Sequence, residues 1–166
     1  MENPIKRRKP RSRIDRALRL ATELMPYDGD IDALIHVLSD SRGKPIRVLQ
    51  IPTPVDSPSG GWFECEDVDY VVVDATSTRS RYVAIVCHEL AHILLGHQGQ
   101  PLNNTQMAQM APTLSPDVAA RFLGRHGYDS DIEHEAELLG TKLAAAAARA
   151  RFDAGGAQDR VSRRVR

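Results

Sequence analysis

The residues with the clearest chemical content are HELAH, residues 88–92, in which two histidines stand four positions apart with a glutamate after the first. Residues four apart on a helix share one face, so the imidazoles of His88 and His92 can reach one point in space. Two imidazole nitrogens at this spacing supply half of a tetrahedral zinc site, and Glu89 can act as a general base toward water. The motif therefore predicts one zinc ion per chain, with His88 and His92 as ligands and Glu89 as the catalytic residue.

A catalytic zinc site of this kind needs a third protein ligand. The metzincin pattern would place a histidine six residues after His92, but that position is Gln98. His97 lies nine residues after His88, half a turn around a continuous helix, and is expected at the surface. The third ligand is therefore expected from another helix, and the segment DIEHEAELLG at 131–140 offers several carboxylates.

Small and apolar residues at helical spacing give this second helix a packing stripe, which consists of Ile132, Ala136, Leu139, Gly140 and Leu143. At 100° per residue, Glu133 and Glu135 flank the stripe on opposite sides, each about 80° from its centre. Glu137 lies further round and is expected in solvent, and His134 faces away from the stripe. Helical geometry alone leaves the choice between Glu133 and Glu135 open.

HELAHILLGH at 88–97 and YDSDIEHEAELLGTKL at 128–143 together resemble the ImmA/IrrE family of zinc-dependent metallopeptidases. The resemblance covers about residues 70–145. In the family pattern E-x-E-A-x-x-x-A, the glutamate before the alanine is the metal ligand, which here implies Glu135. Gly140 stands where the family has the second alanine. Membership implies a zincin-like, gluzincin-type fold and the cleavage or control of a transcriptional repressor in stress response or mobile-element regulation.

Periodicity predicts the elements that must hold these residues. Helices are expected over 14–25, 30–42, 80–95, 116–124 and 131–149, and strands over 46–51, 62–65 and 70–74. Helices, then a small sheet, then helices again indicate an α+β domain, with the sheet packed against the HExxH helix and the glutamate-bearing helix. The apolar strand 70–74 is expected to be covered on both faces and to offer an edge to an extended substrate.

The chain has 166 residues, 42% of them apolar, which is enough for one core. The expected organisation is a basic flexible tail at 1–12, a zincin-like metallopeptidase domain at 13–150 and an Arg-rich flexible tail at 151–166. The formal net charge is zero, but basic residues gather in both end segments and leave the middle acidic. The tails are expected to be solvated, and contact with nucleic acid is the alternative.

The composition also indicates the cellular compartment of the protein. No run approaches 18 apolar residues, so no membrane partner is expected. Two cysteines, Cys65 and Cys87, fit a reducing environment, and no apolar run of signal-peptide length follows the basic start. These features indicate a cytoplasmic protein.

The sequence thus predicts a zinc metalloendopeptidase of narrow specificity. Its expected protein substrate is a separate helix-turn-helix transcriptional regulator, because the chain itself contains no such motif. The alternative is a regulatory or toxin–antitoxin component that acts by binding such a regulator, but a non-catalytic site would not need Glu89. Candidates for stabilising an oxyanion are Tyr82, Tyr128 and His126, for each of which a structural role is the competing interpretation.

Overall fold

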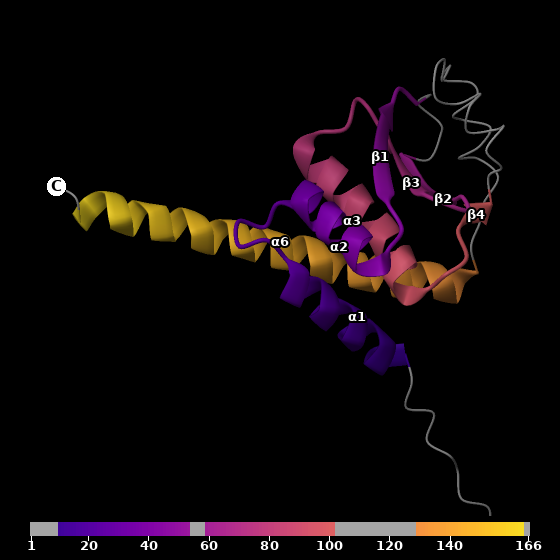
Figure 1. Ribbon diagram of the computed structural model, residues 1–166, viewed down its shortest axis with the longest axis horizontal. Coiled ribbons are helices and arrows are strands. Elements are labelled where there is room, and N and C mark those ends of the chain that lie inside the picture. The colour runs from indigo at the N-terminus through magenta and orange to yellow at the C-terminus, as the bar shows by residue number, and fades with distance from the viewer. Residues whose placement is uncertain (1–9, 54–58, 102–128, 165–166) are drawn as a thin grey trace, which may run out of the picture.

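The computed structural model describes residues 10–53, 59–101 and 129–164 (Figure 1). The elements in chain order are α1 Pro10–Leu24, α2 Ile31–Arg42, β1 Ile46–Ile51, β2 Gly60–Glu64, β3 Asp69–Asp74, α3 Arg79–Leu95, β4 Gln100–Pro101 and α6 Ser130–Arg164. Every helix and strand expected within these ranges is present. The helix expected at 116–124 lies outside the described residues.

The strands form a mixed sheet in the order β1-β3-β2-β4. The parallel pair β1 and β3 runs in register from Ile46 opposite Asp69 to Ile51 opposite Asp74, and β2 pairs antiparallel with the other edge of β3. The expectation that the strand at 70–74 offers a free edge is therefore wrong, because β3 has a partner on each side. The central position of β3 explains its apolar sequence, and Val71, Val72 and Val73 are buried.

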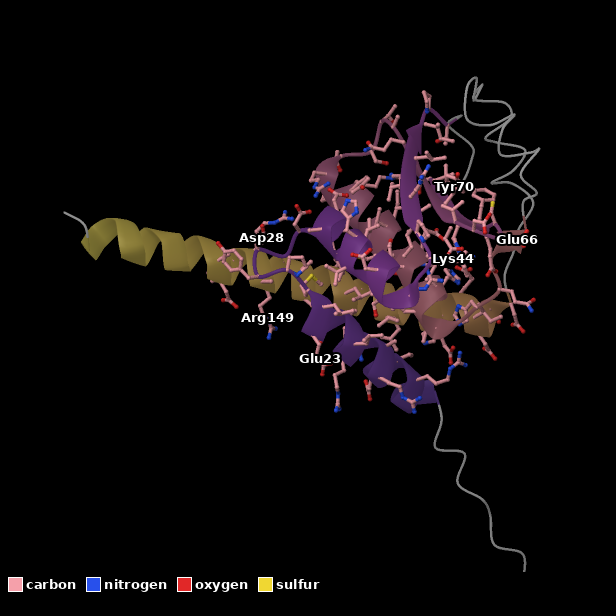
Figure 2. The ribbon with its side chains drawn as sticks, in the orientation of Figure 1. Glu23, Asp28, Lys44, Glu66, Tyr70 and Arg149 are labelled. Atoms are coloured by element: carbon pink, nitrogen blue, oxygen red, sulfur yellow. The ribbon has the colours of Figure 1, made fainter. Side chains whose placement is uncertain are left out.

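One buried carboxylate fixes the start of β3 against the end of α2. Asp69 is fully buried, and its two oxygens lie 2.9 Å from a guanidinium nitrogen of Arg42 and 2.9 Å from Nζ of Lys44. Figure 2 shows Lys44 beside the sheet. Because a buried carboxylate needs charged or hydrogen-bonding partners, these two cations allow Asp69 to occupy the core.

Local capping sets the limits of α2 and α3. The Asp30 side chain accepts a hydrogen bond from the Asp32 amide, and Thr78 does the same for Arg81. Each helix ends at a glycine with a left-handed backbone, Gly43 in α2 and Gly96 in α3. Both glycines directly follow the helix ends expected at 42 and 95.

The longest helix, α6, packs against α3 and α1, and its C-terminal part extends past the other elements (Figure 1). Residues 151–164 belong to this helix, so the expectation of a flexible tail from 151 is wrong. The run of strong helix formers at 144–151 continues into this segment, and no proline interrupts it. At the other end, Pro10 begins α1, so the basic tail expected at 1–12 includes the first residues of that helix.

The hydrophobic core lies between the sheet and the helices. Its members come from α1, α2, α3, α6 and the strands, and include Ala21, Leu34, Val71, Leu90 and Leu139. The described residues therefore form a small α+β domain with one core, as predicted. Among the described helices, none combines the length and apolar character needed to cross a membrane.

Candidate metal centre

The HExxH residues lie in the second half of α3, where α6 crosses it. The contact is close at Gly140, because a Cβ atom added there would lie 2.9 Å from Cα of His88 and 3.1 Å from its backbone nitrogen. Ala136, Leu139 and Leu143 of α6 are fully buried on the same side. The expected packing stripe is confirmed, and its small central residue lets α6 lie directly against the backbone of His88.

Three donor groups converge beside this crossing: the imidazoles of His88 and His92 and the carboxylate of Glu133. The two Nε2 atoms are 3.1 Å apart. Nε2 of His88 lies 3.4 Å from Oε2 of Glu133, and Nε2 of His92 lies 3.5 Å from Oε1. A tetrahedral metal with bonds of about 2.0–2.1 Å would separate its ligand atoms by about 3.3–3.4 Å. The two imidazoles and the carboxylate therefore have the donor types and the spacing of three of the four ligands in a tetrahedral site.

The carboxylate in this group is Glu133 and not Glu135, which is the reverse of the choice implied by the family resemblance. The two side chains project from opposite flanks of the α6 stripe, as helical geometry requires. Oε2 of Glu135 lies 3.4 Å from Nε2 of His97 and 3.9 Å from a guanidinium nitrogen of Arg13. The crossing of α6 over α3 therefore brings one flank to the HExxH histidines and the other to the end of α3.

Glu89 lies on the inner side of the centre and is 6% exposed. In the metal-free protein, burial and then the negative charge of Glu133 raise the pKa of its carboxyl to about 8, against the opposing effect of a hydrogen bond from the Trp62 backbone. A buried carboxyl with a perturbed pKa beside candidate metal ligands is typical of a functional group.

His92 is fully buried, whereas His88 and Glu133 are partly exposed. Burial, together with the neighbouring His88 and His97, lowers the pKa of His92 to about 3. The imidazole is therefore neutral at pH 7, the form that can bind a metal ion. The centre is open to solvent on the side of His88 and Glu133.

His97 is not the surface residue expected from the sequence, because its side chain is 5% exposed. The helical extrapolation fails since α3 ends at Leu95, and Gly96 turns the chain back. Burial lowers the pKa of His97, and Glu135 partly opposes this effect. The sequence carries a signal for this placement, because Gly96 directly follows the helix expected at 80–95 and glycine commonly ends a helix with a left-handed turn.

The remaining candidates do not belong to the group of three converging donors. His134 is exposed, as expected. Glu137 is also exposed, although its Oε2 lies 3.4 Å from Nδ1 of His88. Tyr82 is buried in the first turn of α3 and donates a hydrogen bond to Asp32 of α2, which indicates a structural role. Tyr128 and His126 lie outside the described residues.

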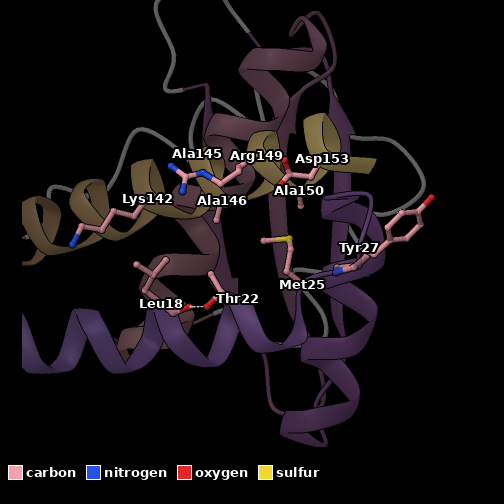
Figure 3. Close-up of a pocket in the computed structure, with 11 residues that line it drawn as sticks. Leu18, Thr22, Met25, Tyr27, Lys142, Ala145, Ala146, Arg149, Ala150 and Asp153 are labelled. Atoms are coloured by element: carbon pink, nitrogen blue, oxygen red, sulfur yellow. Dashed lines mark hydrogen bonds between the residues drawn. The ribbon is translucent and has the colours of Figure 1, made fainter. Parts of the chain in front are cut away.

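A cavity of about 570 Å³ lies between the C-terminal part of α1 and the middle of α6 (Figure 3). Leu18, Met25 and Ala146 contribute apolar walls, and Lys142 and Arg149 contribute charge. None of the residues of the metal centre lines it. This cavity is therefore separate from the group formed by His88, His92 and Glu133.

No protein-family model matches this chain, and no curated protein gives a significant match. The resemblance to the ImmA/IrrE family therefore depends on the two motifs at 88–97 and 128–143.

Proposed function

We propose that this protein is a zinc-dependent peptidase with His88, His92 and Glu133 as metal ligands and Glu89 as the general base. The observation that carries the proposal is the convergence of three donor groups from two helices, with nearest atoms separated by 3.1–3.5 Å, beside a buried glutamate. Two imidazoles and one carboxylate suit zinc better than magnesium or calcium, which prefer all-oxygen sites.

When bound, zinc would lower the pKa of a water molecule and polarise the carbonyl of the scissile peptide bond. Glu89 would accept the proton that the attacking water loses and deliver it to the leaving amine. Burial raises the pKa of Glu89 in the metal-free protein, and the positive charge of a bound zinc ion would lower it again and leave the carboxylate able to accept a proton. The open side near His88 and Glu133 allows a peptide to approach, and Glu133 completes the ligand set from α6.

The strand β2 is the best candidate for holding an extended substrate. One edge of Gly60–Glu64 pairs with β3, and on the other edge the described part of β4 pairs only with Phe63 and Glu64. The backbone of Trp62 contacts the Glu89 carboxylate, so this edge adjoins the proposed general base. A peptide added to β2 as a further strand would therefore pass close to Glu89.

The α+β architecture and the two motifs also support the proposal of a zincin-like fold related to the ImmA/IrrE family. On that basis we propose a separate helix-turn-helix transcriptional regulator as the substrate. The alternative is a protein that controls the regulator by binding alone. On that alternative, a variant that keeps the metal but lacks the Glu89 base should still act on the regulator, whereas a peptidase variant of this kind should not.

The metal is tested first, on the purified chain. We expect about one zinc per chain, retained on gentle purification or taken up on titration. Glu133→Ala should lower the affinity for zinc, and His134→Ala, at an exposed position of the same helix, is the control. Failure of the unaltered protein to bind zinc would overturn the site.

The reaction is tested with Glu89→Gln, because the amide keeps the size of the carboxylate but cannot accept a proton. Cells producing the native chain should contain new protein N-termini, measured by mass spectrometry, that are absent with the variant. Zinc content should be equal in both proteins. With a purified substrate, cleavage should fall on the order of 10²–10⁴-fold. A variant with the native effect in cells would overturn the enzyme and favour the binding alternative.

A further inference from the structure

Behind His92, on the side away from the metal centre, a chain of polar side chains leads to α1. Gly96 has φ 66°, and the backbone N–H of His97 then bonds to the carbonyl oxygen of His92 at 3.0 Å. This reversal turns His97 back over the last turn of α3, where its ring packs edge-to-face with that of His92 at 5.0 Å between centroids. A residue outside the helix thus becomes a neighbour of His92.

The polar contacts along this chain are continuous. Nδ1 of His97 lies 2.9 Å from Nδ1 of His92, and Nε2 of His97 lies 3.4 Å from Oε2 of Glu135. A guanidinium nitrogen of Arg13 lies 3.9 Å from the same carboxylate oxygen. The other terminal nitrogen of Arg13 donates a hydrogen bond to the carbonyl of Leu95. Arg13 therefore links Glu135 to the C-terminal end of α3.

We propose that His97 and Glu135 are positioning residues that hold His92 in the orientation and protonation form needed for metal binding. This inference rests on the proposed function, because it assigns a partner to one of the proposed ligands. A metal bound at Nε2 of His92 requires the ring proton on Nδ1. That proton is donated to Nδ1 of His97, and His97 in turn donates its Nε2 proton to Glu135. All four ring nitrogens then have a defined role.

This arrangement gives Glu135 a function different from that of a direct ligand. Its carboxylate lies on the far side of His97, while Nε2 of His92 points toward His88 and Glu133. A carboxylate that accepts a hydrogen bond at the end of such a chain makes the metal-binding nitrogen more basic and fixes the ring orientation. Loss of outer partners of this kind lowers metal affinity by about 10–100-fold.

The test measures the dissociation constant for zinc, by competition with a chromogenic chelator, in the native chain and four variants. His97→Leu removes the acceptor for the His92 proton and should weaken zinc binding by about 10–100-fold. His97→Asn places an amide oxygen near the position of Nδ1 and should recover most of the loss. Glu135→Gln keeps an acceptor but removes the charge, so a smaller loss is expected. His134→Leu, at an exposed position, should bind zinc as the native chain does.

Melting temperatures of the metal-free variants separate positioning from packing. A packing role would make His97→Asn and His97→Leu bind zinc equally, whatever their stability, and would overturn the proposal. Zinc binding by His97→Leu within twofold of the native value would also overturn it. If His97→Leu does not fold, the zinc affinities of Glu135→Gln and His97→Asn decide the question. The proposal is then overturned if both of these variants bind zinc with the native affinity. No zinc binding by the native chain would instead refute the metal site itself.

Discussion

Replacing Glu89 by glutamine should change how the stability of the metal-free protein depends on pH. The Glu89 carboxyl is 6% exposed, and its pKa rises from an ordinary value of 4.5 to about 8, first because of burial and then because of Glu133. The folded state therefore keeps a proton that the unfolded chain releases. Its contribution to stability is complete below pH 4.5 and is lost as the pH rises through 8.

The size of the effect follows from this shift. Each pH unit between the two pKa values costs about 1.4 kcal/mol of folding free energy, so the whole shift corresponds to at most about 5 kcal/mol. Between pH 6.5 and pH 8 the native chain should lose about 1.5 kcal/mol relative to Glu89→Gln, because the folded carboxyl is half ionised at the upper limit. The lowered pKa values of His92 and His97 also make stability depend on pH, but both histidines are present in the two proteins, so their titration cancels in the difference.

Urea unfolding in the presence of a chelator, repeated at several pH values, measures the difference directly. The free energy of unfolding of Glu89→Gln minus that of the native chain should increase steadily from pH 6.5 to 8. Glu23→Gln is the matched control, because Glu23 is exposed on α1 (Figure 2) and meets water in both states. A difference between the native chain and Glu89→Gln that stays constant across this range would refute the assignment of a buried, protonated carboxyl.

Three further predictions concern the ligand choice, the helix crossing and the buried ion pairs. Glu133→Ala should weaken zinc binding more than Glu135→Ala, and the opposite order in a chelator competition would reinstate the choice implied by the family resemblance. Gly140→Ala should destabilise the chain by about 1–3 kcal/mol, because the new methyl meets the backbone of α3. Gly155→Ala on the same helix has free space around the new methyl and should stabilise the chain by up to about 1 kcal/mol. Equal shifts in the melting temperatures of the two variants would contradict the close crossing of α6 and α3. Asp69→Asn should cost about 1–3 kcal/mol in urea unfolding, since it leaves two cations without their carboxylate, and an unchanged midpoint would show that these pairs do not contribute.

Much of the local structure follows from short stretches of sequence. Asp30 and Gly43 limit α2, Gly96 ends α3, and the strand at 46–51 has the predicted bounds. These features depend on capping, backbone conformation and side-chain periodicity within a few residues, so neighbours in the chain suffice to determine them. The HExxH spacing belongs to the same class, because one turn of helix places both imidazoles on one face.

The strand order could not be read in this way. An apolar strand such as β3 can be internal or at an edge, and the expectation of a free edge failed because β1 pairs with it across a long stretch of chain. The extension of α6 beyond 150 was also missed. The Arg-rich sequence of this extension has few apolar residues. Hydrophobic periodicity cannot indicate a helix where no apolar stripe is needed for packing.

The residue types and the HExxH spacing thus determine what chemistry the centre could perform, but only the tertiary structure decides which residues take part. Glu133 and Glu135 are equivalent on an isolated helix, and the crossing of α6 over α3 brings Glu133 to His88 and His92 and Glu135 to His97. His97 is distant from His92 on a continuous helix, yet the left-handed turn at Gly96 places their rings together. Both outcomes depend on the position of one segment relative to another, which the periodicity of a single helix does not contain.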